Sequence, residues 1–238
     1  MHPTAKTARI AGALYFSTLP IALYCWSYIP GKLIVRGNAS ATAQNMLAHE
    51  TWFRLSILGD LIGHVIFICV GFALYRLLRE VNRPWAVAML GFNLVQGAIG
   101  FFNALNSIAA VILFQGADFL AVLDKGQRDA LAMFFLRLHG QGFVVNEIFW
   151  GVWLLPLGLL VVRSRFLPRF LGIWLIVACF GWIALSISDL LYPGSSAAFS
   201  KPIQFVTIGE TAFALWLLIR GVNLRALAPE QAVAVTLV

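Results

Sequence analysis

The sequence has few charged residues: Lys, Arg, Asp and Glu occupy 11% of its 238 positions, while 61% are hydrophobic. Water-soluble domains carry about a quarter charged residues and less than about half apolar ones, so a soluble domain is excluded. Cysteine is also scarce. Cys25, Cys69 and Cys179 each lie inside an apolar run, which excludes a secreted module held together by disulfides. The composition indicates a chain that places most of its surface in a lipid bilayer.

Motifs of familiar catalytic and transport sites are absent from the sequence. It has no Gly-rich phosphate loop, no His-Glu-x-x-His helix, no Cys-x-x-Cys pair and no Gly-x-Ser-x-Gly turn. It also lacks an arginine-rich voltage sensor and a selectivity-filter sequence. The loops are too short to form a soluble catalytic domain. No cofactor, substrate or catalytic residue is therefore identified by motif.

Six apolar runs are long enough to cross a bilayer as helices, for which about 20 largely apolar residues are needed. The runs are 10–29, 53–75, 85–114, 131–162, 170–191 and 202–219. The sequence thus predicts an all-α, polytopic bundle of six transmembrane helices that forms a single domain over 1–238. A short helix over 39–47, capped by Asn38 or Ser40, is expected to lead into the second span.

The distribution of Lys and Arg predicts the orientation of the spans. If the N-terminus is cytoplasmic, the cytoplasmic side holds ten basic residues: Lys6, Arg9, Arg76, Arg79, Arg83, Arg163, Arg165, Arg169, Arg220 and Arg225. The other side holds six: Lys32, Arg36, Arg54, Lys125, Arg128 and Lys201. Both termini are therefore predicted to be cytoplasmic. Topology and attraction to anionic lipids explain the net charge of +7, so membrane lipids are expected partners and nucleic acid is not.

Three stretches carry a resemblance to a known family. They are residues 52–83, with the run from Trp52 to Gly63; residues 148–173, with the run from Ile148 to Gly158 and the loop Arg163–Arg169; and the final run from Leu215 to Asn223. Together they resemble the bacterial membrane proteins catalogued as domain of unknown function 4386, over almost the whole chain. The resemblance implies a six-helix protein of the bacterial inner membrane, and it implies no activity.

Four of the ten acidic residues lie inside predicted spans: Asp60, Glu147, Asp189 and Glu210. An ionised carboxylate near the bilayer centre costs about 2.5–3.5 kcal/mol on insertion scales, so such groups face the protein interior, pair or take up a proton. Asp60 lies 16 residues from Arg76, and Glu147 lies 16 residues from Arg163. Both positions are about 24 Å above the inner boundary. Asp189 is expected near the outer boundary.

A second polar layer is predicted just below the first. His64, Asn93, Gln96 and Glu210 lie about 15–20 Å from the arginines at the inner ends of their spans. Asp60 and His64 are four residues apart and share a helix face. Asn93, Gln96, Gly100, Asn103 and Ser107 form one stripe along the third span. We therefore take Asp60, His64, Asn93, Gln96, Glu147 and Glu210 as the candidate ligand-binding residues.

Each polar feature also has a purely structural interpretation. Asp60 and His64 can form a hydrogen bond that links two helices, and the amides of the stripe can link helices in the same way. Two groups at this spacing supply only part of a metal site, which usually needs three protein ligands. No metal is predicted. Pro156 is expected to kink the fourth span and free a backbone carbonyl.

Three functions are compatible with this pattern. The first is a binding or accessory module whose buried polar cluster holds a small amphiphilic ligand without chemistry of its own. The second is an intramembrane enzyme that acts on a lipid or isoprenoid, with Glu147, Asp60 or Glu210 as general acid or base. The third is a small proton-coupled transporter that uses the same acids as a relay. The short loops and the absence of a visible inverted repeat count against transport.

Overall fold

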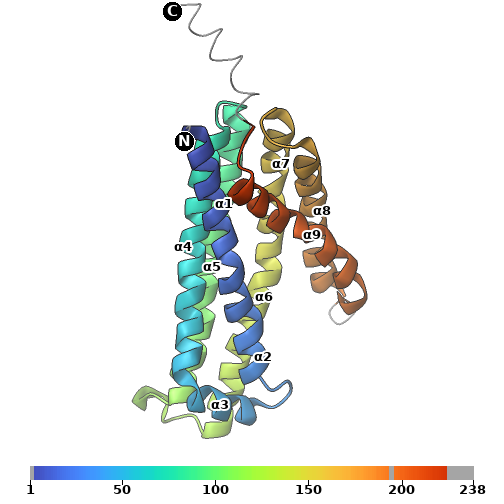
Figure 1. Cartoon of the computed structure of the whole chain (residues 1–238). Coiled ribbons are helices and arrows are strands. Elements are labelled where there is room, and N and C mark those ends of the chain that lie inside the picture. The colour runs from blue at the N-terminus through green and yellow to red at the C-terminus, as the bar shows by residue number, and fades with distance from the viewer. Residues whose placement is uncertain (1–2, 193–195, 224–238) are drawn as a thin grey trace, which may run out of the picture. The chain divides into compact units, whose positions relative to one another are not determined.

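The computed structural model describes residues 3–192 and 196–223, and all regular structure in these ranges is helical (Figure 1). The α-helices are α1 (Pro3–Ala22), α2 (Ile29–Leu33), α3 (Ala39–Ala48), α4 (Glu50–Leu78), α5 (Arg83–Gln115), α6 (Lys125–Val152), α7 (Leu154–Arg163), α8 (Arg169–Leu191) and α9 (Ser196–Ile219). A π-helical turn, η1 (Leu23–Tyr28), joins α1 to α2, and a short 3-10 turn, η2 (Asp118–Leu120), precedes α6. The predicted all-α class is confirmed.

Among the residues that the structure describes, five segments are long and apolar enough to cross a membrane: Thr4–Leu33, Glu50–Leu78, Arg83–Gln115, Lys125–Arg163 and Arg169–Leu191. They contain the first five predicted runs. The sixth run, 202–219, lies within α9, where the described apolar part is the shorter segment Val206–Ile219. The chain is therefore a polytopic helical protein with five long candidate spans and one shorter apolar helix.

Local sequence signals explain where several helices begin. The Asn38 side chain accepts a hydrogen bond from the backbone N–H of Ala41 at 2.9 Å, which caps α3 as predicted. The Asn82 side chain accepts one from Trp85 at the start of α5, at 3.1 Å. Prolines mark the starts of two helices, because α5 begins at Arg83, directly before Pro84, and α8 begins directly after Pro168.

The fourth predicted span is interrupted rather than continuous. Helix α6 ends at Val152 and α7 begins at Leu154, with the fully buried Trp153 between them. Pro156 has no backbone N–H, so it cannot complete the hydrogen bond to the residue four positions earlier. The break thus falls within one turn of the proline, as the sequence indicates.

The chain forms two compact units. Unit 1 comprises Met1–Ser17, Phe67–Gln96 and Glu147–Val238, and unit 2 comprises Thr18–Ile66 and Gly97–Asn146. Helices α1, α4, α5 and α6 therefore contribute one segment to each unit. The expectation of a single domain over 1–238 stays a prediction.

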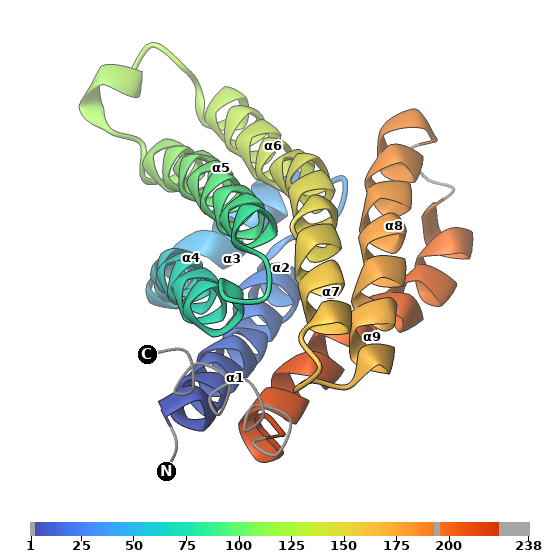
Figure 2. The ribbon, with the colours of Figure 1, turned by 90° about the horizontal axis from the view of Figure 1, so that it is seen from above.

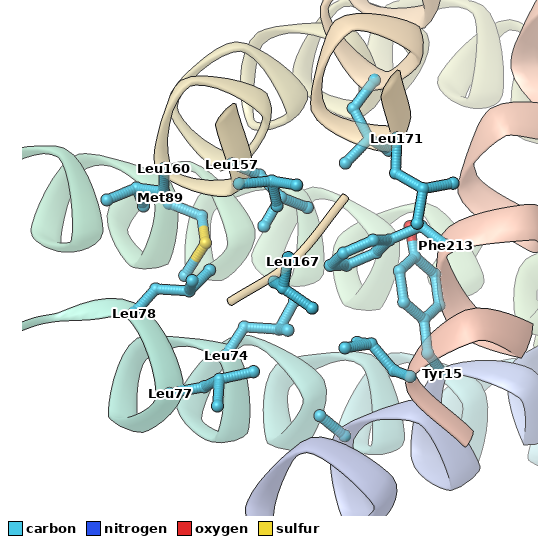
Figure 3. Close-up of a cluster of buried hydrophobic side chains, with 14 of the residues drawn as sticks. Tyr15, Leu74, Leu77, Leu78, Met89, Leu157, Leu160, Leu167, Leu171 and Phe213 are labelled. Carbon is cyan, nitrogen blue, oxygen red and sulfur yellow. The ribbon is translucent and has the colours of Figure 1, made fainter. Parts of the chain in front are cut away.

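Unit 1 has a large apolar core. Figure 3 shows part of it, with side chains from α1, α4, α5, α7, α8 and α9 turned toward one another. Leu74, Leu157, Leu160 and Phe213 are among its fully buried members. Helices α7, α8 and α9 lie side by side in sequence order (Figures 1 and 2). A Cβ atom added at Gly158 would lie 2.7 Å from the carbonyl oxygen of Gly172, so α7 and α8 touch through their backbones.

Unit 2 has a separate apolar core. It is formed by residues of α2, α3, α4, α5 and α6: Ile29, Leu33, Ala43, Met46, Phe53, Ala110, Val111, Leu113, Phe114, Ala132 and Leu136. The first span approaches α4 at two glycines, Gly59 and Gly63. A Cβ atom added at Gly59 would lie 2.8 Å from the Cys25 sulfur, and one at Gly63 would lie 3.3 Å from Ile21. The two glycines allow this close packing.

Candidate functional site

In unit 1, Glu210 accepts hydrogen bonds from side chains of two other helices. The Tyr15 hydroxyl in α1 donates to Oε2, and the Trp182 indole N–H in α8 donates to Oε1 at 2.6 Å. Both carboxyl oxygens of this α9 residue are therefore occupied. Tyr15 is 7% exposed, so water has little access to its bond. The arrangement links three helices through one carboxyl group, a role that a buried polar group can fill without any chemistry.

Aromatic rings surround this carboxyl group. The Tyr15 ring lies edge-on to Phe67 at 5.4 Å between centroids, and Phe67 lies edge-on to Trp153 at 5.1 Å. Trp182 packs edge-on against Trp150 at 5.2 Å. Such pairs fix ring orientation through their quadrupoles. They hold the phenol and the indole where their donors reach Glu210.

Glu147 in α6 and Asp189 in α8 form a second acidic feature of unit 1. Their carboxyl groups are close enough to interact electrostatically, and Glu147 is 9% exposed. Within the described ranges, Glu147 Oε2 and Asp189 Oδ1 have no hydrogen-bond partner. Buried polar atoms are normally paired, so an orphaned carboxyl oxygen needs an explanation. Each of the two acids therefore carries a buried acceptor that no described residue satisfies.

The two amides of the candidate set also belong to unit 1. Asn93 is completely buried and donates from Nδ2 to the Phe67 carbonyl oxygen at 3.1 Å. A Cβ atom added at Gly71 would lie 2.2 Å from Asn93 Oδ1, so this side chain packs directly on α4. Gln96 is 3% exposed. The predicted interhelical amide bond is thus confirmed for Asn93.

In unit 2, Asp60 lies between Trp26 and His64. The Trp26 indole N–H donates to Asp60 Oδ1 at 2.7 Å, and His64 Nε2 lies 3.6 Å from the same oxygen. Trp26 stands in the π-helical turn η1, whose extra residue per turn changes the direction of its side chains. The His64 ring rests on Gly100, where an added Cβ atom would lie 2.1 Å from Cε1. Asp60 and His64 therefore lie on one face as predicted, but the hydrogen bond to Asp60 comes from the Trp26 indole, and His64 Nε2 makes no hydrogen bond within the described ranges.

A reciprocal pair lies in the same unit. Asn103 Nδ2 donates to the His139 carbonyl oxygen at 2.9 Å, and His139 Nδ1 lies 3.1 Å from the Asn103 carbonyl oxygen. Asn106 donates to Asn103 Oδ1 at 3.1 Å. Phe143 packs against both His139 and Trp26, at 4.7 and 4.9 Å. Asn103, a member of the predicted polar stripe, is 7% exposed and links α5 to α6.

The six candidate residues divide between the two units. Asp60 and His64 belong to unit 2, whereas Asn93, Gln96, Glu147 and Glu210 belong to unit 1. A single site that includes all six stays a prediction. In the described part of the chain, no three His, Cys, Asp or Glu side chains lie close enough together to hold a metal ion.

Sequence reasoning did not identify the donors that meet the acids. Tyr15, Trp26 and Trp182 are all missing from the candidate set. One signal was available, because a buried tyrosine hydroxyl or indole N–H usually finds an acceptor. The spans contain few acids to accept such bonds. Nothing in the sequence, however, indicates which aromatic residue meets which acid.

Comparisons with known proteins identify one family over most of the chain. The sequence profile of the family described as Domain of unknown function (DUF4386) matches residues 10–221. An uncharacterized protein of Archaeoglobus fulgidus is 31% identical over 167 residues, which are 70% of this chain and 83% of that relative. No solved structure matches the chain. The chain therefore belongs to the DUF4386 family.

Proposed function

We propose that this protein is a six-span protein of the bacterial inner membrane that binds a small amphiphilic ligand, with both termini in the cytoplasm. Five long apolar helices support the membrane placement, and α9 supplies the sixth span. The larger number of Lys and Arg residues on the predicted cytoplasmic side supports the orientation. Reporters fused to the C-terminus test the orientation. We expect activity from a reporter that works only in the cytoplasm and none from a reporter that works only outside it.

The observation that carries the binding function is the orphaned oxygen of Glu147. Glu210 and Asp60 have donors within the protein, at Trp182 and Trp26, so helix packing accounts for them. Glu147 Oε2 is buried and, among the described residues, has no donor. Packing alone does not explain a buried acceptor that is left unpaired. A ligand with a hydroxyl or amino group would satisfy it.

The surroundings of Glu147 favour an amphiphile over a polar solute. Trp150 follows Glu147 by three positions, on the same side of α6, and packs against Trp182. The paired indoles of Trp150 and Trp182 are an apolar feature of the same unit as Glu147 and Asp189. A molecule with one polar head and an apolar body fits such a site. The bilayer supplies molecules of this kind.

Native mass spectrometry of the gently purified protein tests the proposal. We expect a bound amphiphile that is lost from Glu147→Gln, because the amide replaces one acceptor oxygen with a donor. Glu50→Gln is the matched control, since Glu50 pairs with Arg54 at 2.6 Å on the exposed start of α4. A native protein that carries no small molecule, or equal retention by both variants, would contradict the binding function.

A second candidate function uses the same unpaired oxygen of Glu147. An unpaired buried carboxyl group can act as a general acid or base toward a lipid or isoprenoid, or as a step in proton-coupled transport. Incubation of the protein with its co-purified amphiphile separates these alternatives from binding. Chemical conversion that Glu147→Gln abolishes would establish the enzyme. Proton uptake into proteoliposomes that depends on the amphiphile and on Glu147 would establish the transporter. An unchanged ligand and an absent proton flux support simple binding.

A further inference from the structure

A pocket of about 340 Å³ lies in unit 1 between the α7–α8 loop and the end of α9. Two exposed arginines, Arg165 and Arg220, stand at its opening, and the buried side chains of Phe166, Leu167 and Val222 line its interior. The pocket thus combines two guanidinium groups with an apolar interior. None of its residues belongs to the carboxyl cluster described above.

The backbone around the pocket is held in a defined conformation. Arg165 has φ 55°, and Gly221 has φ 66°, so both adopt the left-handed region that forms tight turns. The Asn223 N–H donates to the Phe166 carbonyl oxygen at 3.0 Å, which ties the end of α9 to the loop. Gly221 N–H also donates to the Trp216 carbonyl oxygen at 3.0 Å. The two arginines are therefore presented by a preformed turn.

The side chains that the structure describes around the pocket do not neutralise its positive charge. Among residues 3–192 and 196–223, no Asp or Glu lines the pocket. Neither Arg165 nor Arg220 takes part in an ion pair in the described ranges. Arg163 and Arg169, at the two ends of the loop, do not line the pocket. The described lining of the pocket therefore presents two guanidinium groups without an acidic partner.

The pocket also lies at the ends of apolar helices. Its loop connects the candidate spans Lys125–Arg163 and Arg169–Leu191, and its other side follows the apolar segment Val206–Ile219. Trp216 lines the pocket and packs edge-on against Phe170 at 6.0 Å. Tryptophan is enriched where the hydrocarbon core meets the headgroups. The opening is therefore placed at headgroup level.

We propose that this pocket binds the phosphate group of an anionic membrane lipid. A guanidinium group matches phosphate oxygens with two parallel hydrogen bonds, so two arginines can hold one phosphate from two sides. The buried apolar side chains would contact the glycerol and the first acyl carbons. The inference rests on the membrane placement of the helices and is independent of Glu147. A soluble phosphate ester has the same anionic group, and the experiment separates the two sources.

The test measures lipid retention by the full chain in detergent with native mass spectrometry. Phosphatidylglycerol is the probe, and phosphatidylcholine is the comparison lipid of similar shape. We expect phosphatidylglycerol to be retained and each of Arg165→Gln and Arg220→Gln to weaken its binding about tenfold, as expected for loss of one charge-assisted contact. Arg169→Gln removes a charge from the same loop outside the pocket, and we expect its affinity to stay within about twofold of the native value.

Three results would overturn the proposal. The first is equal retention of both lipids, and the second is an equal loss in Arg169→Gln. The third is displacement of the lipid by glycerol 3-phosphate that binds as tightly as phosphatidylglycerol, which would assign the arginines to a soluble ester. A thermal unfolding curve without lipid checks that each variant is folded. If Arg165→Gln unfolds because of its left-handed backbone, Arg220→Gln at the end of α9 provides the decisive measurement.

Discussion

Substitution of Tyr15 by Phe isolates one of the two hydrogen bonds to Glu210. The change removes only the hydroxyl group, because the ring remains and keeps its contacts with Phe67 and Trp153. One of the two carboxyl oxygens of Glu210 then loses its donor, while Trp182 continues to serve the other. The variant therefore measures how much this hydrogen bond between α1 and α9 contributes to the free energy of unfolding.

The expected cost follows from the burial of the bond. Hydrogen bonds between transmembrane helices contribute about 0.6 kcal/mol on average and at most about 1.7 kcal/mol. A buried acceptor left unpaired costs about 1–3 kcal/mol. Tyr15 is 7% exposed, so water cannot readily replace its hydroxyl group. We therefore expect Tyr15→Phe to lower the free energy of unfolding by about 1–2 kcal/mol.

Equilibrium unfolding in mixed micelles, followed by tryptophan fluorescence, provides the measurement. Tyr24→Phe is the matched control, because the Tyr24 hydroxyl is buried and, among the described residues, has no hydrogen-bond partner. We expect that control to be neutral or slightly stabilising. A double-mutant cycle with Glu210→Gln then isolates the pairwise energy. A Tyr15→Phe variant as stable as the native protein, or a coupling energy near zero, would refute the role assigned to this bond.

Three further substitutions test the packing around glycines in helices. Gly158→Ala should destabilise the protein by about 1–3 kcal/mol, because its Cβ atom would lie 2.7 Å from the carbonyl oxygen of Gly172 and a backbone atom cannot easily move. A Cβ atom added at Gly91 would have no other atom within 4 Å, so Gly91→Ala should instead stabilise α5 by up to about 1 kcal/mol. The thermal unfolding temperatures of Gly158→Ala and Gly91→Ala should therefore shift in opposite directions. Gly100→Ala should displace the His64 ring, because the added carbon would lie 2.1 Å from it. The imidazole NMR signals of His64 should therefore change. Unchanged signals would contradict the observed packing.

Much of the fold could be predicted from the sequence because membrane spans depend on local composition. Each of the six apolar runs lies in helical segments of the structure, and the short helix before α4 begins at the predicted cap, Asn38. Prolines also mark helix boundaries in the structure: α8 begins directly after Pro168, and the break at Trp153 lies near Pro156. Such features arise from residues within one helical turn of each other. The family resemblance was likewise confirmed, over residues 10–221.

The candidate site was predictable only in part. Burial of Asn93, Gln96, Asn103 and Ser107 follows from their spacing along one helix face, and the structure buries all four. The i, i+4 pairing of Asp60 with His64 was visible for the same reason. The arginine pocket was not foreseen, although both arginines were assigned to the cytoplasmic side. Its shape depends on a turn that brings Phe166 against Asn223.

The sequence by itself determined the helical class, the positions of the apolar spans and the presence of acids within them, because these properties depend on composition and on periodicity along one helix. Only the tertiary structure decided which donor reaches which acid. Tyr15 and Glu210 are 195 positions apart, and their contact depends on how α1 and α9 are rotated about their axes. That rotation results from the packing of many apolar side chains at once, and no local pattern specifies it.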